Sequence, residues 1–278
     1  MSNLSTITAE NPLVLIGCGK MGGSMLAGWL KEGLSPDAVQ IVDPFLDPVR
    51  KSFPELGNLH EAVDGLGQSL KPSFVIMAVK PQMMNDALAA LKEHDLSSAV
   101  VMSVAAGKTI HYFEDHLGLD QAIVRAMPNT PAAIGKGITV CVANGPVSDA
   151  AKNICSTLLE TVGDVEWIDD EALMDAVTAL SGSGPAYVFY MAEAMAAAGE
   201  AIGLSPELSQ KLARQTVAGA GGLLEESDET ASKLRENVTS PGGTTAAALD
   251  VLMSEEGIAR IIRRAMQEAK NRSKELAG

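Results

Sequence analysis

The chain has 278 residues, of which 46% are hydrophobic and 20% charged, and it carries a formal net charge of −14. This length and composition indicate a folded protein of one large or two smaller domains. The acidic balance argues against nonspecific binding to nucleic acid or to an anionic membrane surface, and no apolar run approaches the roughly 20 residues of a membrane span.

The first predicted element is a buried parallel strand at residues 12–16, and helical spacing follows from Met21. Between them lies a run that fits G-x-G-x-x-G: Gly17, Cys18, Gly19, Lys20, Met21 and Gly22. In such a turn the first glycine allows the bend, the second lets the backbone approach a pyrophosphate, and the third lets the helix pack on the strand. The order of strand, turn and helix predicts a dinucleotide site. The alternative is a glycine-rich turn without a ligand.

A second predicted strand at residues 39–42 ends at Asp43, 21 residues after Gly22. An acidic residue there accepts hydrogen bonds from the adenosine ribose of NAD and repels the 2′-phosphate of NADP. Asp43 also suits a turn with Pro44, and the nearby Arg50 and Lys51 would accommodate NADP. The predicted cofactor is therefore NADH or NADPH, with Asp43 favouring NADH.

Further strands are predicted at residues 74–79, 99–104, 122–126, 138–142 and 165–168, separated by helical or turn-like spacers. This alternation predicts a mostly parallel, doubly wound sheet of the Rossmann type. Ligands bind at the carboxyl ends of such strands. We therefore expect cofactor contacts from two strand ends: Ala78, Val79, Lys80 and Pro81, and Met127, Pro128, Asn129 and Thr130.

Strand signals stop near residue 169, and helical periodicity takes over. We therefore predict a dinucleotide-binding domain at residues 1–168 and a helical domain at 169–278, which is an α/β fold followed by an all-α one. The Ala-rich helix expected from Ala186 to Ile202 is apolar around most of its circumference. Such a helix indicates burial between subunits as well as within one, and hence a dimer.

One stretch of the helical part combines hydroxyls and glycines ahead of a predicted helix at residues 246–252: Ser240, Pro241, Gly242, Gly243, Thr244 and Thr245. Unpaired N–H groups and the helix dipole make such a start an anion site, although a plain helix cap has the same composition. Residues 171–210 contain no Lys, Arg or His. Oxidation or reduction at a C–O bond usually needs such a group as a general acid or base. Hydride transfer to a protonated imine needs mainly correct positioning of the reactants. An imine that carries a carboxylate is therefore favoured.

Residues 234–249, Arg125–Pro131, Ala78–Pro81 and Ser181–Tyr187 together resemble the motifs of pyrroline-5-carboxylate reductase, in order through almost the whole chain. The resemblance implies reduction of the cyclic imine 1-pyrroline-5-carboxylate to L-proline by NAD(P)H, the last step of proline synthesis. It also implies that Ser240, Gly242, Gly243 and Thr244 hold the substrate carboxylate, and that Thr245 hydrogen-bonds the ring nitrogen as the catalytic residue. Members assemble as dimers through the helical domain, often as decamers. Many carry Ser, Thr, Asn or Arg where this chain has Asp43, which supports NADH.

Two other functions are compatible with these motifs: another cyclic-imine or hydroxy-acid reductase on the same fold, and a nucleotide-binding regulatory protein without turnover. The absence of a lysine after the Ser181–Gly184 turn disfavours a hydroxy acid. The presence of both glycine motifs disfavours a protein that has lost catalysis.

The three cysteines, Cys18, Cys141 and Cys155, have no metal-ligand spacing, so we expect reduced thiols in a cytoplasmic protein and no metal site.

Overall fold

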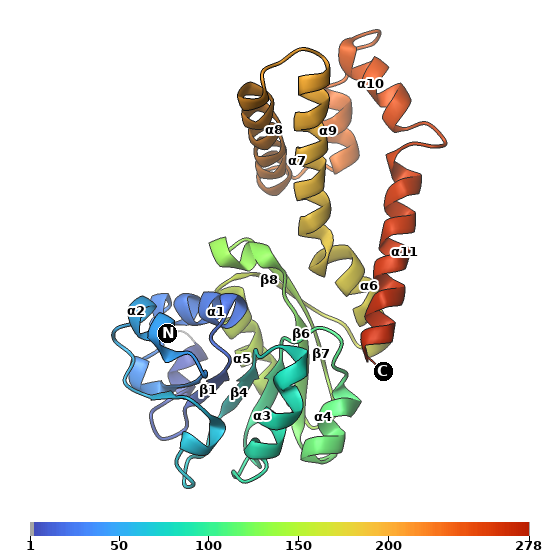
Figure 1. Cartoon of the computed structure of the whole chain (residues 1–278). Helices are drawn as coiled ribbons and strands as arrows, with labels where there is room; N and C mark the ends of the chain where they lie inside the picture. The colour runs from blue at the N-terminus through green and yellow to red at the C-terminus, as the bar shows by residue number, and fades with distance from the viewer. Residues whose placement is uncertain (1–2, 278) are drawn as a thin grey trace. The chain divides into compact units, whose positions relative to one another are not determined.

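The computed structural model describes residues 3–277, which form two compact units (Figure 1). The first unit runs to Gly182 and includes the segment from Lys270 onward, and the second covers Ser183–Ala269. None of the described helices is long and apolar enough to cross a lipid bilayer.

The first unit is built on a sheet whose strands, among the described residues, follow the order β3-β2-β1-β4-β5-β6-β7-β8. Neighbouring strands from β3 to β6 are parallel, β7 runs antiparallel to β6, and β8 is parallel to β7. Their bounds are β1 Leu13–Ile16, β2 Val39–Val42, β3 Leu59–His60, β4 Phe74–Met77, β5 Val100–Ser103, β6 Ala122–Met127, β7 Gly137–Ala143 and β8 Gly163–Trp167.

Helices cover both faces of this sheet, which explains why β1 and β4 are entirely apolar and why every residue of β5 is buried. On one face α1 and α5 pack together, and the Trp29 indole N–H donates to the Leu158 carbonyl oxygen at 2.7 Å. On the other face α3 and α4 supply Leu88 and Phe113 to a second core (Figure 1). The bounds are α1 Lys20–Lys31, α2 Leu46–Ser52, α3 Met84–Leu91, α4 Ile110–Leu117 and α5 Asp149–Glu160.

The direction in which successive strands are added to the sheet reverses beside β1. The chain passes from β1 to β2 and β3 on one side and then to β4 on the other. The predicted doubly wound sheet is therefore confirmed, and its topological switch point lies between β1 and β4, where α/β sheets bind ligands. The glycine turn of residues 17–22 is located there.

The second unit is helical and has very little core of its own. Within residues 183–269, all of which the structure describes, the buried residues are Ala196, Ser209 and Ala213. Helices α7 and α8 pack closely at Gly199, where an added Cβ would lie 2.9 Å from the Ser209 hydroxyl oxygen. The helices of the second half of the chain are α6 Met174–Val177, α7 Gly184–Ala201, α8 Pro206–Glu226, α9 Ala231–Asn237, α10 Thr244–Leu252 and α11 Ile258–Ala277.

The two compact units divide the chain at a different place from the domains expected at residues 1–168 and 169–278. The segment after β8 stays with the first unit because Met174 is buried in its core and Glu171 forms an ion pair with Arg125. The end of α11 also belongs to the first unit, where the Ser273 hydroxyl donates to the Asp175 carboxylate at 2.7 Å. The hydrophobic periodicity of the sequence shows where the strands end. The first unit extends further because residues after the last strand still pack against it.

Candidate functional site

The glycine turn between β1 and α1 has three different structural requirements. Gly17 adopts φ +95°, and a Cβ there would lie 2.7 Å from the Ala78 carbonyl carbon. A Cβ on Gly22 would lie 2.1 Å from the Gly17 carbonyl oxygen, so this position also excludes a side chain. A Cβ on Gly19 would meet nothing within 4 Å. Gly17 and Gly22 therefore close the turn, whereas Gly19 leaves open space above the backbone.

The open space lies at the start of α1, whose N-cap is Gly19 and has no capping side chain. The N–H groups in the first turn of a helix have no partner within the helix and carry the positive end of its dipole. Together with the uncovered backbone of Gly19, they form a cradle that fits a pyrophosphate. Lys20 and Met21 occupy this first turn, and Lys20 is exposed.

Asp43, directly after β2, connects two loops at this edge of the sheet. Its carboxylate accepts the Cys18 N–H and the Phe45 N–H, each at 2.8 Å. It thereby fixes the glycine turn before any ligand binds. A carboxylate offers about four acceptor positions, so two remain for ribose hydroxyls. Burial, with a smaller contribution from the Asp43 charge, raises the pKa of the Cys18 thiol to about 11, so Cys18 is a neutral thiol.

A cavity of about 330 Å³ runs along these loops and brings together predicted cofactor residues from three segments: the glycine turn, Asp43 and the end of β4. Lys80 is its basic residue and Asp43 its acidic one. Pro81 begins the next 3₁₀ turn, so the chain leaves the cavity there. The lining residues are Gly17, Cys18, Gly19, Asp43, Pro44, Phe45, Pro48, Ala78, Val79, Lys80 and Met83.

The second predicted cofactor segment, Met127–Thr130, begins at the last residue of β6 and does not line this cavity. It is fixed by Asn129, whose amide N–H donates to the Ser181 carbonyl oxygen at 3.2 Å and whose side-chain oxygen accepts the Ile138 N–H at 3.0 Å. Pro128 is buried, Thr130 is exposed, and a Cβ on Gly182 would lie 2.4 Å from the Met127 methyl carbon. The segment therefore lies at the same edge of the parallel strands, against the turn of residues 181–182.

The hydroxyl-rich stretch belongs to the second unit and begins α10. The helix starts at Thr244, two residues earlier than expected, with Gly243 as its N-cap. Gly242 adopts φ +69°, and the Gly243 N–H donates to the Ser240 carbonyl oxygen at 3.0 Å. Because the cap is a glycine, no side chain covers the first-turn N–H groups, and Thr245 is half-buried beside them. This geometry can hold a small anion such as a carboxylate.

Comparison with known proteins identifies both parts of the chain. Residues 171–276 match the family model described as pyrroline-5-carboxylate reductase dimerisation, and residues 12–107 match the one described as NADP oxidoreductase coenzyme F420-dependent. Curated pyrroline-5-carboxylate reductases are similar over nearly the full chain. The protein from Pseudomonas aeruginosa is 36% identical over 95% of this chain and 96% of its own, and that from Haemophilus influenzae is 37% identical over 95% and 97%.

The chain belongs to the pyrroline-5-carboxylate reductase family. The predicted family, the predicted fold and the predicted activity, nicotinamide-dependent reduction of 1-pyrroline-5-carboxylate, are confirmed at this level. The reductase structure from Coxiella burnetii has a TM-score of 0.88 at 33% identity and covers 97% of this chain and 99% of its own. The Plasmodium falciparum reductase, solved with NADP bound, has a TM-score of 0.82 at 29% identity and covers 98% and 100%.

A second cavity of this reductase, which no motif in the sequence predicts, adjoins the first, and the two together form a groove. This second cavity has a volume of about 300 Å³, shares Pro44, Val79 and Met83 with the first and is mostly apolar. It is lined in addition by Ile16, Val42, Glu61, Ala62, Val63, Asp64, Asp86, Ala87 and Ala90. Four of these residues, Glu61 to Asp64, directly follow β3, which has two residues and therefore shows no periodicity. Among residues 3–277, no group of three or more His, Cys, Asp or Glu side chains is placed to hold a metal ion.

Proposed function

We propose that this reductase binds the dinucleotide along the edge of β1, β2 and β4 and the substrate carboxylate at the start of α10. The observation that carries the cofactor assignment is the uncovered backbone at Gly19, which faces an open cavity beside an uncapped helix start. Contacts come from Gly17–Gly22, Asp43 and Ala78–Pro81, and from Met127–Thr130 at the end of β6. When bound, the reduced nicotinamide supplies a hydride to the imine carbon.

The substrate is held by groups of the second unit. The hydroxyl of Ser240, the backbone of Gly242 and Gly243, and the first-turn N–H of Thr244 bind its carboxylate, because they surround an uncapped helix start. The Thr245 hydroxyl lies one residue further into the helix and orients the ring nitrogen by a hydrogen bond. A protonated imine is already electrophilic, so this orientation is the main contribution required from the chain.

The other two candidate functions have less support. No Lys, Arg or His lies between residues 171 and 210 to act on a hydroxy acid, and a regulatory protein has no need of a carboxylate cradle. The functional division between cofactor binding and substrate binding falls near residues 168 and 169. We place the protein in the cytoplasm, where its three free thiols stay reduced.

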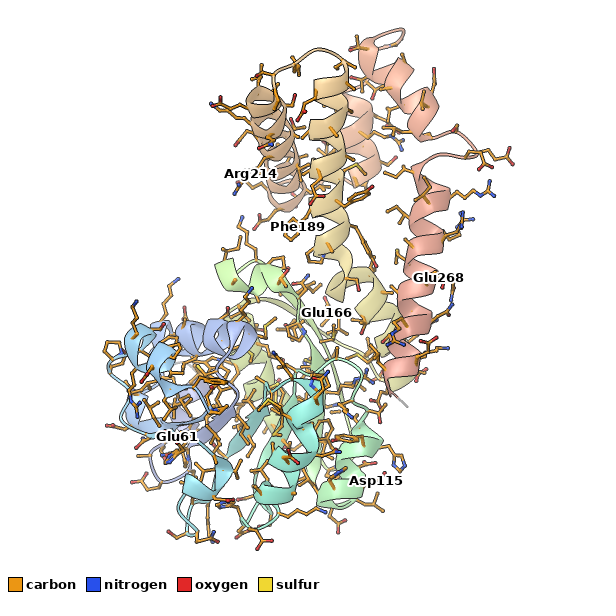
Figure 2. All side chains as sticks on the ribbon, viewed as in Figure 1. Glu61, Asp115, Glu166, Phe189, Arg214 and Glu268 are labelled. Carbon is orange, nitrogen blue, oxygen red and sulfur yellow. The ribbon has the colours of Figure 1, made fainter. Side chains whose placement is uncertain are left out.

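Self-association follows from the match of residues 171–276 to a dimerisation family and from the small core of the second unit. The dimer forms through α7, α8 and α10, whose apolar side chains are left exposed in the single chain. Examples are Phe189 at 62%, Tyr190 at 70% and Val251 at 71% exposure, with Phe189 labelled on α7 in Figure 2. Assembly of such dimers into a decamer is the larger form that we propose.

Oxidation of NADH and of NADPH, each with 1-pyrroline-5-carboxylate, tests this function directly by absorbance. We expect turnover with both and a larger kcat/KM with NADH. Turnover of other cyclic imines with no turnover of this one would overturn the substrate assignment, and binding of dinucleotide without any turnover would support the regulatory alternative.

Asp43→Ser tests the preference for NADH. Removing the carboxylate removes repulsion of a 2′-phosphate, so we expect the NADPH-to-NADH ratio of kcat/KM to rise roughly tenfold. Affinity for both cofactors should also fall, because the Cys18 and Phe45 N–H groups lose their acceptor. An unchanged ratio would remove Asp43 from cofactor selection and leave it as an anchor of the glycine turn.

A further inference from the structure

The two connected cavities differ in charge. The part beside the glycine turn has one basic and one acidic residue, Lys80 and Asp43. The second part is lined by three acidic residues, Glu61, Asp64 and Asp86, and by no basic one. Its remaining lining is mostly apolar, which suits the flat face of an adenine. Neither part is lined by Arg50 or Lys51, the two basic residues that would accommodate NADP.

Strand register places one of these acids next to Asp43. Val42 of β2 pairs with His60 of β3, and the Asp43 N–H donates to the His60 carbonyl oxygen at 3.0 Å. Glu61 is the residue after His60, so Asp43 and Glu61 occupy equivalent positions just beyond the ends of neighbouring parallel strands. Main chains at such positions are about 5 Å apart.

We propose that Glu61 is a second specificity-determining residue, which together with Asp43 excludes a 2′-phosphate from the adenosine half of the groove. This inference rests on the proposed position of the cofactor. With the pyrophosphate at Gly19 and the adenine in the apolar part, the ribose between them lies beside Asp43, which lines the first cavity, and Pro44, which lines both. A 2′-phosphate adds a charge of about −1.5 to −2 at that ribose.

Arg50 is not placed to neutralise this charge, because it lines neither cavity. Its guanidinium lies 3.5 Å from the Asp47 carboxylate, in an exposed ion pair. Glu61 is also exposed, so its effect is a screened, medium-range repulsion and not a direct contact. That mechanism makes a distinctive prediction, because the discrimination must follow the charge at position 61 and must weaken with salt.

The experiment is calorimetric binding of NAD⁺ and of NADP⁺ to the full chain, for Glu61→Gln and Glu61→Lys. We expect the affinity for NADP⁺ relative to NAD⁺ to rise about threefold with Gln and about tenfold with Lys at low salt. Raising the ionic strength from about 0.05 M to 0.5 M should reduce both gains in relative NADP⁺ affinity. At the higher salt the Debye length falls well below about 10 Å, so the charge at position 61 is screened from the 2′-phosphate.

Glu166→Gln is the matched control for Glu61→Gln, since it makes the same charge change at an exposed position of β8, and β3 and β8 stand at opposite ends of the strand order. Figure 2 labels both glutamates. The control should leave the affinity ratio unchanged. Equal ratios in Glu61→Gln, Glu61→Lys and the wild type would overturn the inference, and so would gains that salt does not reduce. Because the measurement needs no substrate, failure of the proposed reaction appears separately, as absent turnover in a chain that still discriminates the two nucleotides.

Discussion

Gly19 is the one glycine of the cofactor turn at which the structure has room for a side chain. Its φ of −74° and ψ of −155° are accessible to any residue, and a Cβ meets nothing within 4 Å. We therefore expect Gly19→Ala to change the free energy of unfolding by less than about 0.5 kcal/mol, as at an ordinary surface position. The affinity for NAD⁺ should fall at least roughly tenfold, because the new methyl group occupies the position of the pyrophosphate.

Thermal unfolding and calorimetric titration of the same samples check this prediction. Gly17→Ala is the contrasting variant, since its Cβ would lie 2.7 Å from Ala78 in a backbone conformation of φ +95°. That change should lower stability as well as binding. Full affinity in a stable Gly19→Ala protein would mean that the pyrophosphate does not approach this backbone.

Thr245 is the only residue to which the proposed mechanism gives a chemical role. It lies in the first turn of α10 and is half-buried. We expect Thr245→Ala to lower kcat by roughly ten- to a hundredfold, because the ring nitrogen loses its orienting hydrogen bond. Circular dichroism should show an intact helical unit. Thr245→Ser keeps the hydroxyl and should recover most of the activity, whereas unchanged kcat and KM in the alanine variant would exclude Thr245 from the mechanism.

At the scale of elements, one carboxylate joins three segments of the first unit. A single oxygen of Glu171 accepts the Arg125 guanidinium from β6 and the Ile110 N–H at the start of α4, each at 2.8 Å. The Arg125 side chain is 5% exposed. This contact fixes the chain just after β8, immediately before the segment that leads to the second unit.

Glu171→Ala should lower the free energy of unfolding by about 2 kcal/mol, because it leaves a buried guanidinium and a backbone N–H without their acceptor. Glu171→Gln retains an oxygen in the same place and should lose about half as much. Urea unfolding of the three proteins measures both differences. Equal stability of the alanine variant and the wild type would mean that solvent replaces the carboxylate.

The elements also differ in how far the sequence predicts them. The strands β1 and β4 contain no polar residue, and a strand needs that pattern only when both its faces are covered. The two residues of β3 are too few for any pattern, so the neighbourhood of Asp43 and Glu61 was not predictable. Two further features depend on tertiary packing, which the local spacing of apolar residues does not encode. They are the antiparallel direction of β7 and the hydrogen bond from the Cys18 N–H to the Asp43 carboxylate.

For the whole molecule, the second unit must associate to be stable in water. Its few buried residues cannot offset the chain entropy lost on ordering four helices and the first part of α11, and apolar side chains remain exposed along α7 and α10. We expect sedimentation of a dimer or larger species at micromolar concentration. Phe189→Glu and Val251→Glu should each weaken association at least roughly tenfold, because burying an unpaired carboxylate is costly.

Leu119→Glu is the matched control, because Leu119 is equally exposed, at 74%, but lies in the first unit. It should leave the sedimentation coefficient unchanged. A wild-type protein that sediments as a monomer would contradict an interface on the helical unit. The sequence predicts this association from the apolar circumference of one helix, but it cannot predict which side chains meet, since that depends on how copies pair.

The neutral thiol of Cys18 has a consequence for the reactivity of that side chain. Peroxides and alkylating reagents attack the thiolate, and a pKa of about 11 leaves little of it at neutral pH. The same Asp43 that anchors the glycine turn contributes to that high pKa. Cys18 should therefore react with peroxide more slowly than an exposed cysteine of ordinary pKa, although it lies within the cofactor loop.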